Sequence, residues 1–289
     1  MHCDGRSCGR GVCGGLTTLL LAVSEPADAG DPEVCRAPWG TGPIRVACLG
    51  DSNTASGWQI GQPDGFPQED GWCERLADEV LSSTNCGWGS ATASPNTTGL
   101  PFFQGAGQLE TALDDPATDV VILAFGTNDV GALLNNPDRL LLEDPTPAGV
   151  ADVIEGLVAE AESAGAAVLV ATTPYRELPT DPARAPPPAG RNDLADELND
   201  ELAQRFGASM RVDFTHSFTT SDYLSDGLHV SASGMAKRAY RARRAVLRVL
   251  PEPDDDRALP VLLALLALQR SWQAVSRAGA SGARRRPRR

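Results

Sequence analysis

Residues 44–54 read Ile-Arg-Val-Ala-Cys-Leu-Gly-Asp-Ser-Asn-Thr. The apolar run that opens this stretch is typical of a buried strand, and Gly50 with the polar residues after it is typical of a turn. In a parallel α/β sheet such a turn lies at the carboxyl edge, where ligands bind. Ser52 is therefore expected to present its hydroxyl to a crevice at that edge, although Gly-Asp-Ser is also an ordinary turn sequence.

Strand and helix patterns alternate along the rest of the chain. The run at 119–125 is apolar with almost no alternation, which indicates a strand covered on both faces. Further strands are expected near 84–86, 167–172 and 210–214, and helices at 72–82, 107–113, 146–164, 193–206 and 232–250. This order predicts a three-layer α/β/α sandwich with a mainly parallel, flavodoxin-like five-stranded sheet.

The chain divides into three parts by composition. Residues 1–40 read as leader and linker, 42–250 as one domain, and 251–289 as an apolar and then basic tail. The leader has a basic start, a short apolar centre at 16–23 and a small-x-small end at 27–29, the pattern of a secretory signal that ends at about residue 29. We therefore expect a secreted or cell-envelope protein, with the cytoplasm as the alternative location.

The tail and the net charge bear on partners. The apolar run at 259–268 is too short to span a bilayer, so it is expected to pack on the domain or to associate with a membrane surface. The net charge is −13 and the pI is about 4.7, which argues against nucleic acid as the main partner.

Seven cysteines are unevenly distributed, and no Cys-x-x-Cys pair suggests a zinc ribbon. Three of them lie in the leader, and the four in the body are Cys35, Cys48, Cys73 and Cys86. An oxidising compartment could pair these four. Cys48, in the middle of a strand, is expected to be a buried small hydrophobe, and a Cys73–Cys86 bridge is one pairing that the sequence allows.

Polar residues follow the later strands as well. Asn128 in Gly126-Thr127-Asn128-Asp129 comes directly after the apolar run at 119–125 and can point its amide into the crevice of Ser52. Asp226 and His229 are three apart before the last predicted helix, so the Asp can bind one imidazole nitrogen and leave the other free. His216, with Asp213 three residues before it, is the rival base.

These residue types supply the roles that acyl transfer needs. A serine hydroxyl is a weak nucleophile and needs an adjacent base, which His229 can be, while Asp226 orients the imidazole. The oxyanion needs fixed donors: the Ser52 N–H, an N–H from Gly89 or Ser90 in the glycine-rich stretch 86–90, and the Asn128 amide. Because the histidine must be neutral to accept a proton, activity is expected to fall on acidification through the histidine titration range.

Gly50-Asp51-Ser52, the glycine-rich stretch, Gly126-x-Asn128-Asp129 and Asp226-x-x-His229, in this order, resemble the SGNH (GDSL) hydrolases. The resemblance implies a serine esterase with Ser52 as nucleophile, His229 as base, Asp226 as acid and Asn128 in the oxyanion hole. On spacing, Ser90 stands where the family has a glycine, which leaves Gly89 and Ser90 both open as donors.

The resemblance also implies a substrate class. The expected substrates are acyl or acetyl esters of sugars, polysaccharides and lipids, and no metal or organic cofactor is implied. G-x-S-x-G, the motif of ordinary α/β-hydrolases, is absent because Thr54 stands at its last position. Long Pro- and Gly-rich loops at 53–71 and 174–190 favour an open, polar mouth and hence a carbohydrate or small ester. The alternative is a non-catalytic carbohydrate- or lipid-binding module on the same fold.

Overall fold

The computed structural model describes residues 35, 40–55, 71–115, 117–177 and 186–250. All of them belong to the compact unit Val34–Arg289. The tail and the proposed signal peptide, together with most of the linker after it, lie outside the described residues, so the proposed domain boundaries stay a prediction. Within the described ranges, no helix combines the length and the apolar content that a bilayer span requires.

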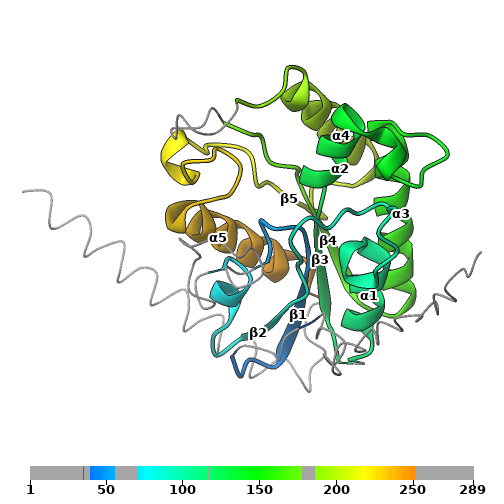
Figure 1. The fold of residues 1–289 in the computed structure, drawn as a ribbon. Coiled ribbons are helices and arrows are strands. Elements are labelled where there is room, and N and C mark those ends of the chain that lie inside the picture. Colours follow the sequence, from blue (N-terminus) through cyan, green and yellow to red (C-terminus); the bar gives the residue numbers. More distant parts are fainter. Residues whose placement is uncertain (1–34, 36–39, 56–70, 116, 178–185, 251–289) are drawn as a thin grey trace, which may run out of the picture. The chain divides into compact units, whose positions relative to one another are not determined.

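A parallel sheet forms the centre of the domain (Figure 1). Its strands are β1 (Ile44–Gly50), β2 (Leu81–Asn85), β3 (Val120–Ala124), β4 (Ala167–Ala171) and β5 (Arg211–Val212). They are ordered β2-β1-β3-β4-β5, and every neighbouring pair is parallel. The carboxyl ends of the strands therefore share one edge, and the predicted fold class is confirmed.

Helices cover both faces of the sheet (Figure 1). They are α1 (Gly105–Leu113), α2 (Thr127–Asn135), α3 (Pro147–Ser163), α4 (Arg191–Arg205) and α5 (Ala232–Val249), with short 3-10 turns at Glu74–Leu76, Pro101–Phe103, Pro137–Arg139 and Thr220–Asp222. Residues from α1, α2, α3 and α4 form one hydrophobic core, and α5 forms the second core with Trp72 and Phe214. Each fully buried large apolar side chain contributes about 1.5–3 kcal/mol.

The helix α3 shows why several predicted boundaries agree with the structure. The Thr146 side chain accepts from the Gly149 N–H at 3.2 Å and Pro147 occupies the first turn. Gly165 follows the helix with φ +92°, a conformation that favours glycine. These signals are local, so the sequence alone reveals them.

The predicted helix 72–82 is wrong. Only the 3-10 turn Glu74–Leu76 forms there, and the Asp78 side chain then accepts from the N–H groups of Val80 and Leu81 at 2.7 and 2.9 Å. Residues 81–85 pair with β1 as strand β2, which is also earlier than the strand expected near 84–86. The apolar residues of 72–82 are buried as expected, but sheet pairing rather than helix period fixes them.

The four body cysteines form two disulfides, Cys35–Cys86 and Cys48–Cys73. The Cys73–Cys86 bridge is therefore wrong, and Cys48 is a bonded cysteine rather than only a buried hydrophobe. Cys48 lies on β1, in register with Asn85 of β2, and Cys73 lies next to the short turn that leads into β2. Which cysteines meet depends on this strand pairing, which spacing in the sequence does not reveal.

Candidate active site

Ser52 lies two residues beyond β1, in a turn closed by backbone hydrogen bonds. The Asp51 carbonyl accepts from the N–H groups of Thr54 and Ala55, both at 2.9 Å. A Cβ at Gly50 would stand 2.3 Å from Thr54 Oγ1 and 2.5 Å from the Ala124 carbonyl, so this turn requires glycine. The turn leaves Ser52 8% exposed at the carboxyl edge of the sheet.

His229 and Asp226 meet Ser52 there. His229 Nε2 lies 3.0 Å from Ser52 Oγ, and His229 Nδ1 lies 2.6 Å from Asp226 Oδ2. The other carboxylate oxygen of Asp226 accepts from the N–H groups of Leu228 and His229 at 2.9 and 3.0 Å. Asp226 therefore holds both the imidazole ring of His229 and the backbone of the loop 226–229.

The same contacts keep Asp226 ionised. Burial opposes its charge, but the hydrogen bonds from the His229 ring and from the Leu228 and His229 backbone outweigh burial, so the pKa of Asp226 lies well below its ordinary value. The group beside the imidazole is thus a carboxylate at any pH near neutrality.

The loop that carries His229 is tied to α5 and to the loop after β4. Asp222 accepts from the Thr219 N–H and from the Lys237 ammonium at 2.8 and 2.5 Å. Burial opposes its ionisation, but Lys237 and the hydrogen bonds lower the pKa of Asp222 to about 2. The Gly227 carbonyl accepts from the Glu177 N–H at 2.8 Å. His229 is therefore held on two sides.

Asn128 lies in the first turn of α2, which begins after Gly126 in a left-handed conformation (φ +111°). A Cβ at Gly126 would stand 2.1 Å from Thr173 Oγ1, so glycine alone fits. Asn128 Nδ2 donates to the Ala91 carbonyl at 2.9 Å. Because an amide nitrogen has two hydrogens, a second donor remains.

The glycine-rich stretch forms a tight turn in which the Ala91 N–H donates to the Trp88 carbonyl at 3.2 Å. Ser90 occupies the position with φ +65°, where glycine is usual, and its side chain is exposed. Within the described part of the chain, the backbone N–H groups of Ser52, Gly89 and Ser90 have no hydrogen-bond partner. All three are therefore available as donors.

Asp129 has a part in the site that the sequence reading missed. Its two carboxylate oxygens accept from the consecutive N–H groups of Ala93 and Ser94 at 3.0 and 3.1 Å. Asp129 is fully buried, and burial raises its pKa against these hydrogen bonds. With the Asn128–Ala91 contact, Asp129 ties the start of α2 to the segment after the tight turn.

Gln108 in α1 was also missed. Its Oε1 accepts from the Gly50 N–H at 2.8 Å and its Nε2 donates to the Gly50 carbonyl at 3.1 Å, so one buried amide holds both sides of the glycine before the nucleophile turn. Only the contact across 58 residues identifies this role, since a glutamine on a helix is unremarkable in sequence.

Two buried ionisable side chains, Arg238 and Asp51, lie at the Ser52 turn. Arg238 is 1% exposed, donates to the Asn53 carbonyl at 3.4 Å and lies 5.2 Å from the Phe214 ring centre. Burial lowers its pKa to about 10. Burial likewise raises the pKa of Asp51, although the Asn53 N–H and Arg238 oppose the change. Arg238 is therefore a structural support for the turn.

His216 does not meet Ser52. It lies in the loop after β5, where its N–H donates to Asp213 Oδ1 at 2.8 Å and its carbonyl accepts from Arg241. Of the two candidate bases, the structure brings His229 to the serine. Across the ranges that the structure describes, no group of three or more His, Cys, Asp or Glu side chains could hold a metal ion.

A parallel α/β sandwich with a serine, a histidine and an aspartate in contact at the carboxyl edge of its sheet defines a candidate hydrolase of the serine type. The model of the GDSL-like Lipase/Acylhydrolase family matches residues 48–237, and the chain belongs to this family. Membership supports ester hydrolysis as the general class of its chemistry.

Solved structures share the fold. An aryl esterase from M. smegmatis and Est24, a carbohydrate acetylesterase from Sinorhizobium meliloti, are each 21% identical, with a TM-score of 0.56 over 72% of this chain and 100% of theirs. A putative arylesterase from Agrobacterium tumefaciens is 23% identical, with a TM-score of 0.52 over 72% of this chain and 100% of its own. Comparison with curated protein sequences finds no match.

Proposed function

We propose that this protein is a serine esterase that hydrolyses carboxylic esters through an acyl-enzyme. The observation that carries the proposal is the chain of contacts Asp226–His229–Ser52, at 2.6 and 3.0 Å. Asp226 accepts a hydrogen bond from Nδ1–H of His229, which leaves Nε2 unprotonated and facing the hydroxyl that has to lose its proton. A binding module has no need of this arrangement, so the non-catalytic alternative has no specific support.

In the first half of the reaction, Ser52 Oγ attacks the ester carbonyl while His229 Nε2 takes its proton. The oxyanion that forms accepts from the Ser52 N–H, the free hydrogen of the Asn128 amide and an N–H of the tight turn. His229 then returns the proton to the leaving alcohol. In the second half, His229 takes a proton from water, the hydroxide attacks the acyl carbon, and the proton goes back to Ser52 Oγ.

The proposed substrate is a short-chain ester of a sugar or of another small alcohol. Trp88 is the first residue of the tight turn, and its ring centre lies 4.6 Å from that of Phe102, so partly exposed aromatic faces adjoin the proposed oxyanion donors. Such faces suit an aryl ring or the C–H face of a sugar ring. Most of the two rim loops lies outside the described residues, so the expected open mouth stays a prediction.

We also propose that the protein works in an oxidising compartment, as a secreted or cell-envelope enzyme. The pairing of all four body cysteines supports this location, because disulfides persist outside the reducing cytosol. The test is thiol blocking. Cells that produce the protein would be lysed in denaturant that contains an alkylating reagent, and the protein would then be isolated and its labelled cysteines identified. Labelling of Cys48 or Cys86 would contradict the proposal.

The activity itself is tested with p-nitrophenyl acetate. We expect turnover by the unchanged protein and none above background with Ser52→Ala, which keeps the fold because an alanine fits the same space. Ser83→Ala, which removes another buried hydroxyl away from the candidate site, is the matched control and should stay active. Equal rates for the unchanged protein and Ser52→Ala would reject the esterase proposal.

A further inference from the structure

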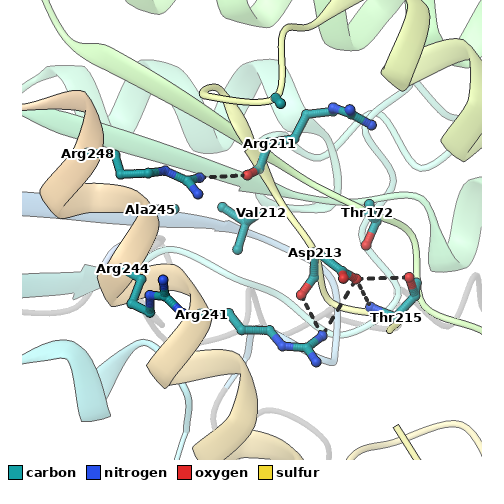
Figure 2. A pocket seen from close by; sticks show the side chains of 10 residues that line it. Thr172, Arg211, Val212, Asp213, Thr215, Arg241, Arg244, Ala245 and Arg248 are labelled. Atoms are coloured by element: carbon teal, nitrogen blue, oxygen red, sulfur yellow. Dashed lines mark hydrogen bonds and ion pairs between the residues drawn. The ribbon is translucent and has the colours of Figure 1, made fainter. Parts of the chain in front are cut away.

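Away from the candidate active site, a hollow lies between β5, the loop that follows it and α5 (Figure 2). Its volume is about 490 Å³, within the usual range for small-molecule sites. β5 is the last strand in the sheet order and pairs only with β4, so this hollow opens at the sheet margin. None of the candidate active-site residues lines it.

Arginines dominate the lining. Arg241, Arg244 and Arg248 contribute from α5, whereas Arg211 of β5 presents its backbone carbonyl to them and points its guanidinium away from α5 (Figure 2). Spacings of three and four residues place the three helical arginines on one side of α5, where like charges repel one another and cost about 0.2–0.5 kcal/mol per pair. The whole chain has a net charge of −13, yet these three arginines concentrate positive charge on one side of α5 despite their mutual repulsion.

Two other cations of α5 have acidic partners. Lys237 lies 2.5 Å from Asp222, and Arg243 pairs with Asp78. In the hollow, Arg241 lies 3.6 Å from Asp213, which is the only carboxylate in the lining. Within the described residues, Arg244 and Arg248 form no ion pair. One carboxylate thus accompanies the three arginines of α5.

The hydrogen bonds that these arginines do make leave donors unused. Arg248 donates one N–H to the Arg211 carbonyl at 3.1 Å, and the Arg244 guanidinium lies 5.7 Å from the Tyr240 ring centre. The N–H groups of Arg244 and Arg248 that remain are donors that an anion can use, and hydrogen bonds between charged groups are the stronger ones.

We propose that this hollow is a second ligand site that binds a phosphate group. A doubly charged phosphate matches the three guanidinium groups of α5, two of which form no ion pair among the described residues, better than a single carboxylate does, and guanidinium forks fit its oxygens in pairs. The volume exceeds that of the phosphate alone, and Val212 and Ala245 give part of the lining an apolar surface. The remaining space suits the body of a small phosphorylated molecule.

The test is calorimetric titration of the purified protein at constant ionic strength with inorganic phosphate, with glucose 6-phosphate and with glucose as the neutral control. We expect saturable binding of the phosphorylated probes only. Arg244→Gln should weaken it by about tenfold, the effect of losing one charged hydrogen bond. Arg139→Gln, which removes the same charge from the 3-10 turn Pro137–Arg139, should bind as the unchanged protein does.

The outcomes separate the sources of the phosphate. Tighter binding of glucose 6-phosphate supports a phosphorylated small molecule, and equal binding of both probes supports free phosphate. Absence of saturable binding, or equal weakening by Arg139→Gln and Arg244→Gln, overturns the proposal. Unchanged hydrolysis of p-nitrophenyl acetate shows that Arg244→Gln is folded, and Arg248→Gln replaces it if its melting temperature falls.

Discussion

His229 Nε2 lies 3.0 Å from Ser52 Oγ although 177 residues separate them in the chain. The two are joined because β1 ends beneath Ser52 and the loop before α5 returns to the same edge of the sheet. No short sequence motif brings these two residues together, so their contact is the observation that carries the proposed mechanism.

His229→Ala should lower kcat by about 10⁴-fold or more, because the hydroxyl of Ser52 would lose its proton acceptor. His216→Ala is the matched control, since it removes the other histidine of the domain, and it should retain full activity. Steady-state rates on p-nitrophenyl acetate measure both. The opposite pattern would make His216 the base.

Asp226→Asn should also lower kcat by about 10⁴-fold, since an amide can donate to Nδ1 and so favour the wrong tautomer. The lowered pKa of Asp226 adds a pH prediction. A carboxyl whose pKa is lowered stays ionised down through its ordinary titration range, so a single ionisation should govern the acid limb of the kcat/KM profile. Two ionisations on that limb would contradict this assignment.

Asn128→Ala should lower kcat by about 10²–10³-fold with little change in KM, the usual effect of losing one oxyanion donor. Steady-state rates on p-nitrophenyl acetate measure both constants.

Asp129→Asn keeps the size of the side chain at residue 129 but weakens its hydrogen bonds to the Ala93 and Ser94 N–H groups. We expect it to lower both the melting temperature and kcat. Loss of kcat in Asp129→Asn at unchanged stability would instead place Asp129 in direct contact with the substrate.

Ser90→Gly should raise thermal stability or leave it unchanged. A non-glycine residue at φ +65° costs about 1–2 kcal/mol, while glycine loses about 0.4–1 kcal/mol through the freedom of the unfolded chain. The backbone N–H survives the change, so esterase activity should persist. Gly89→Ala is the companion variant, and a scanning calorimeter compares the two. A clear fall in melting temperature for Ser90→Gly would show that the serine side chain stabilises the turn.

The sequence predicted the features that depend on local signals. The strand before Ser52, the helix after Thr146 and the spacing of Asp226 and His229 all follow from short-range pattern. The polar residues after successive strands could be assigned to one edge, because parallel strands end together. The sequence favoured His229 as the base but left His216 as a rival, since Asp213–His216 has the same spacing as Asp226–His229, and the structure brings His229 to Ser52.

The features that depend on pairing across the chain were not predictable. The helical period of residues 72–82 competed with the pairing of β2 to β1, and the pairing prevailed. The cysteine partners follow from the same register. Gln108 and Asp129 act on backbone groups 58 and about 35 residues away, and nothing near them in sequence marks that role.

The loop that carries His229 is attached to α5, so the proposed base is held in place only after the last described helix has been synthesised. Ser52, the tight turn and Asn128 leave the ribosome first, while the base and the helix that secures its loop come last among the described elements. A fragment that stops before Asp226 would contain Ser52 and Asn128 but lack the proposed base, His229. On the proposed mechanism, the nascent polypeptide therefore stays inactive until this loop has emerged.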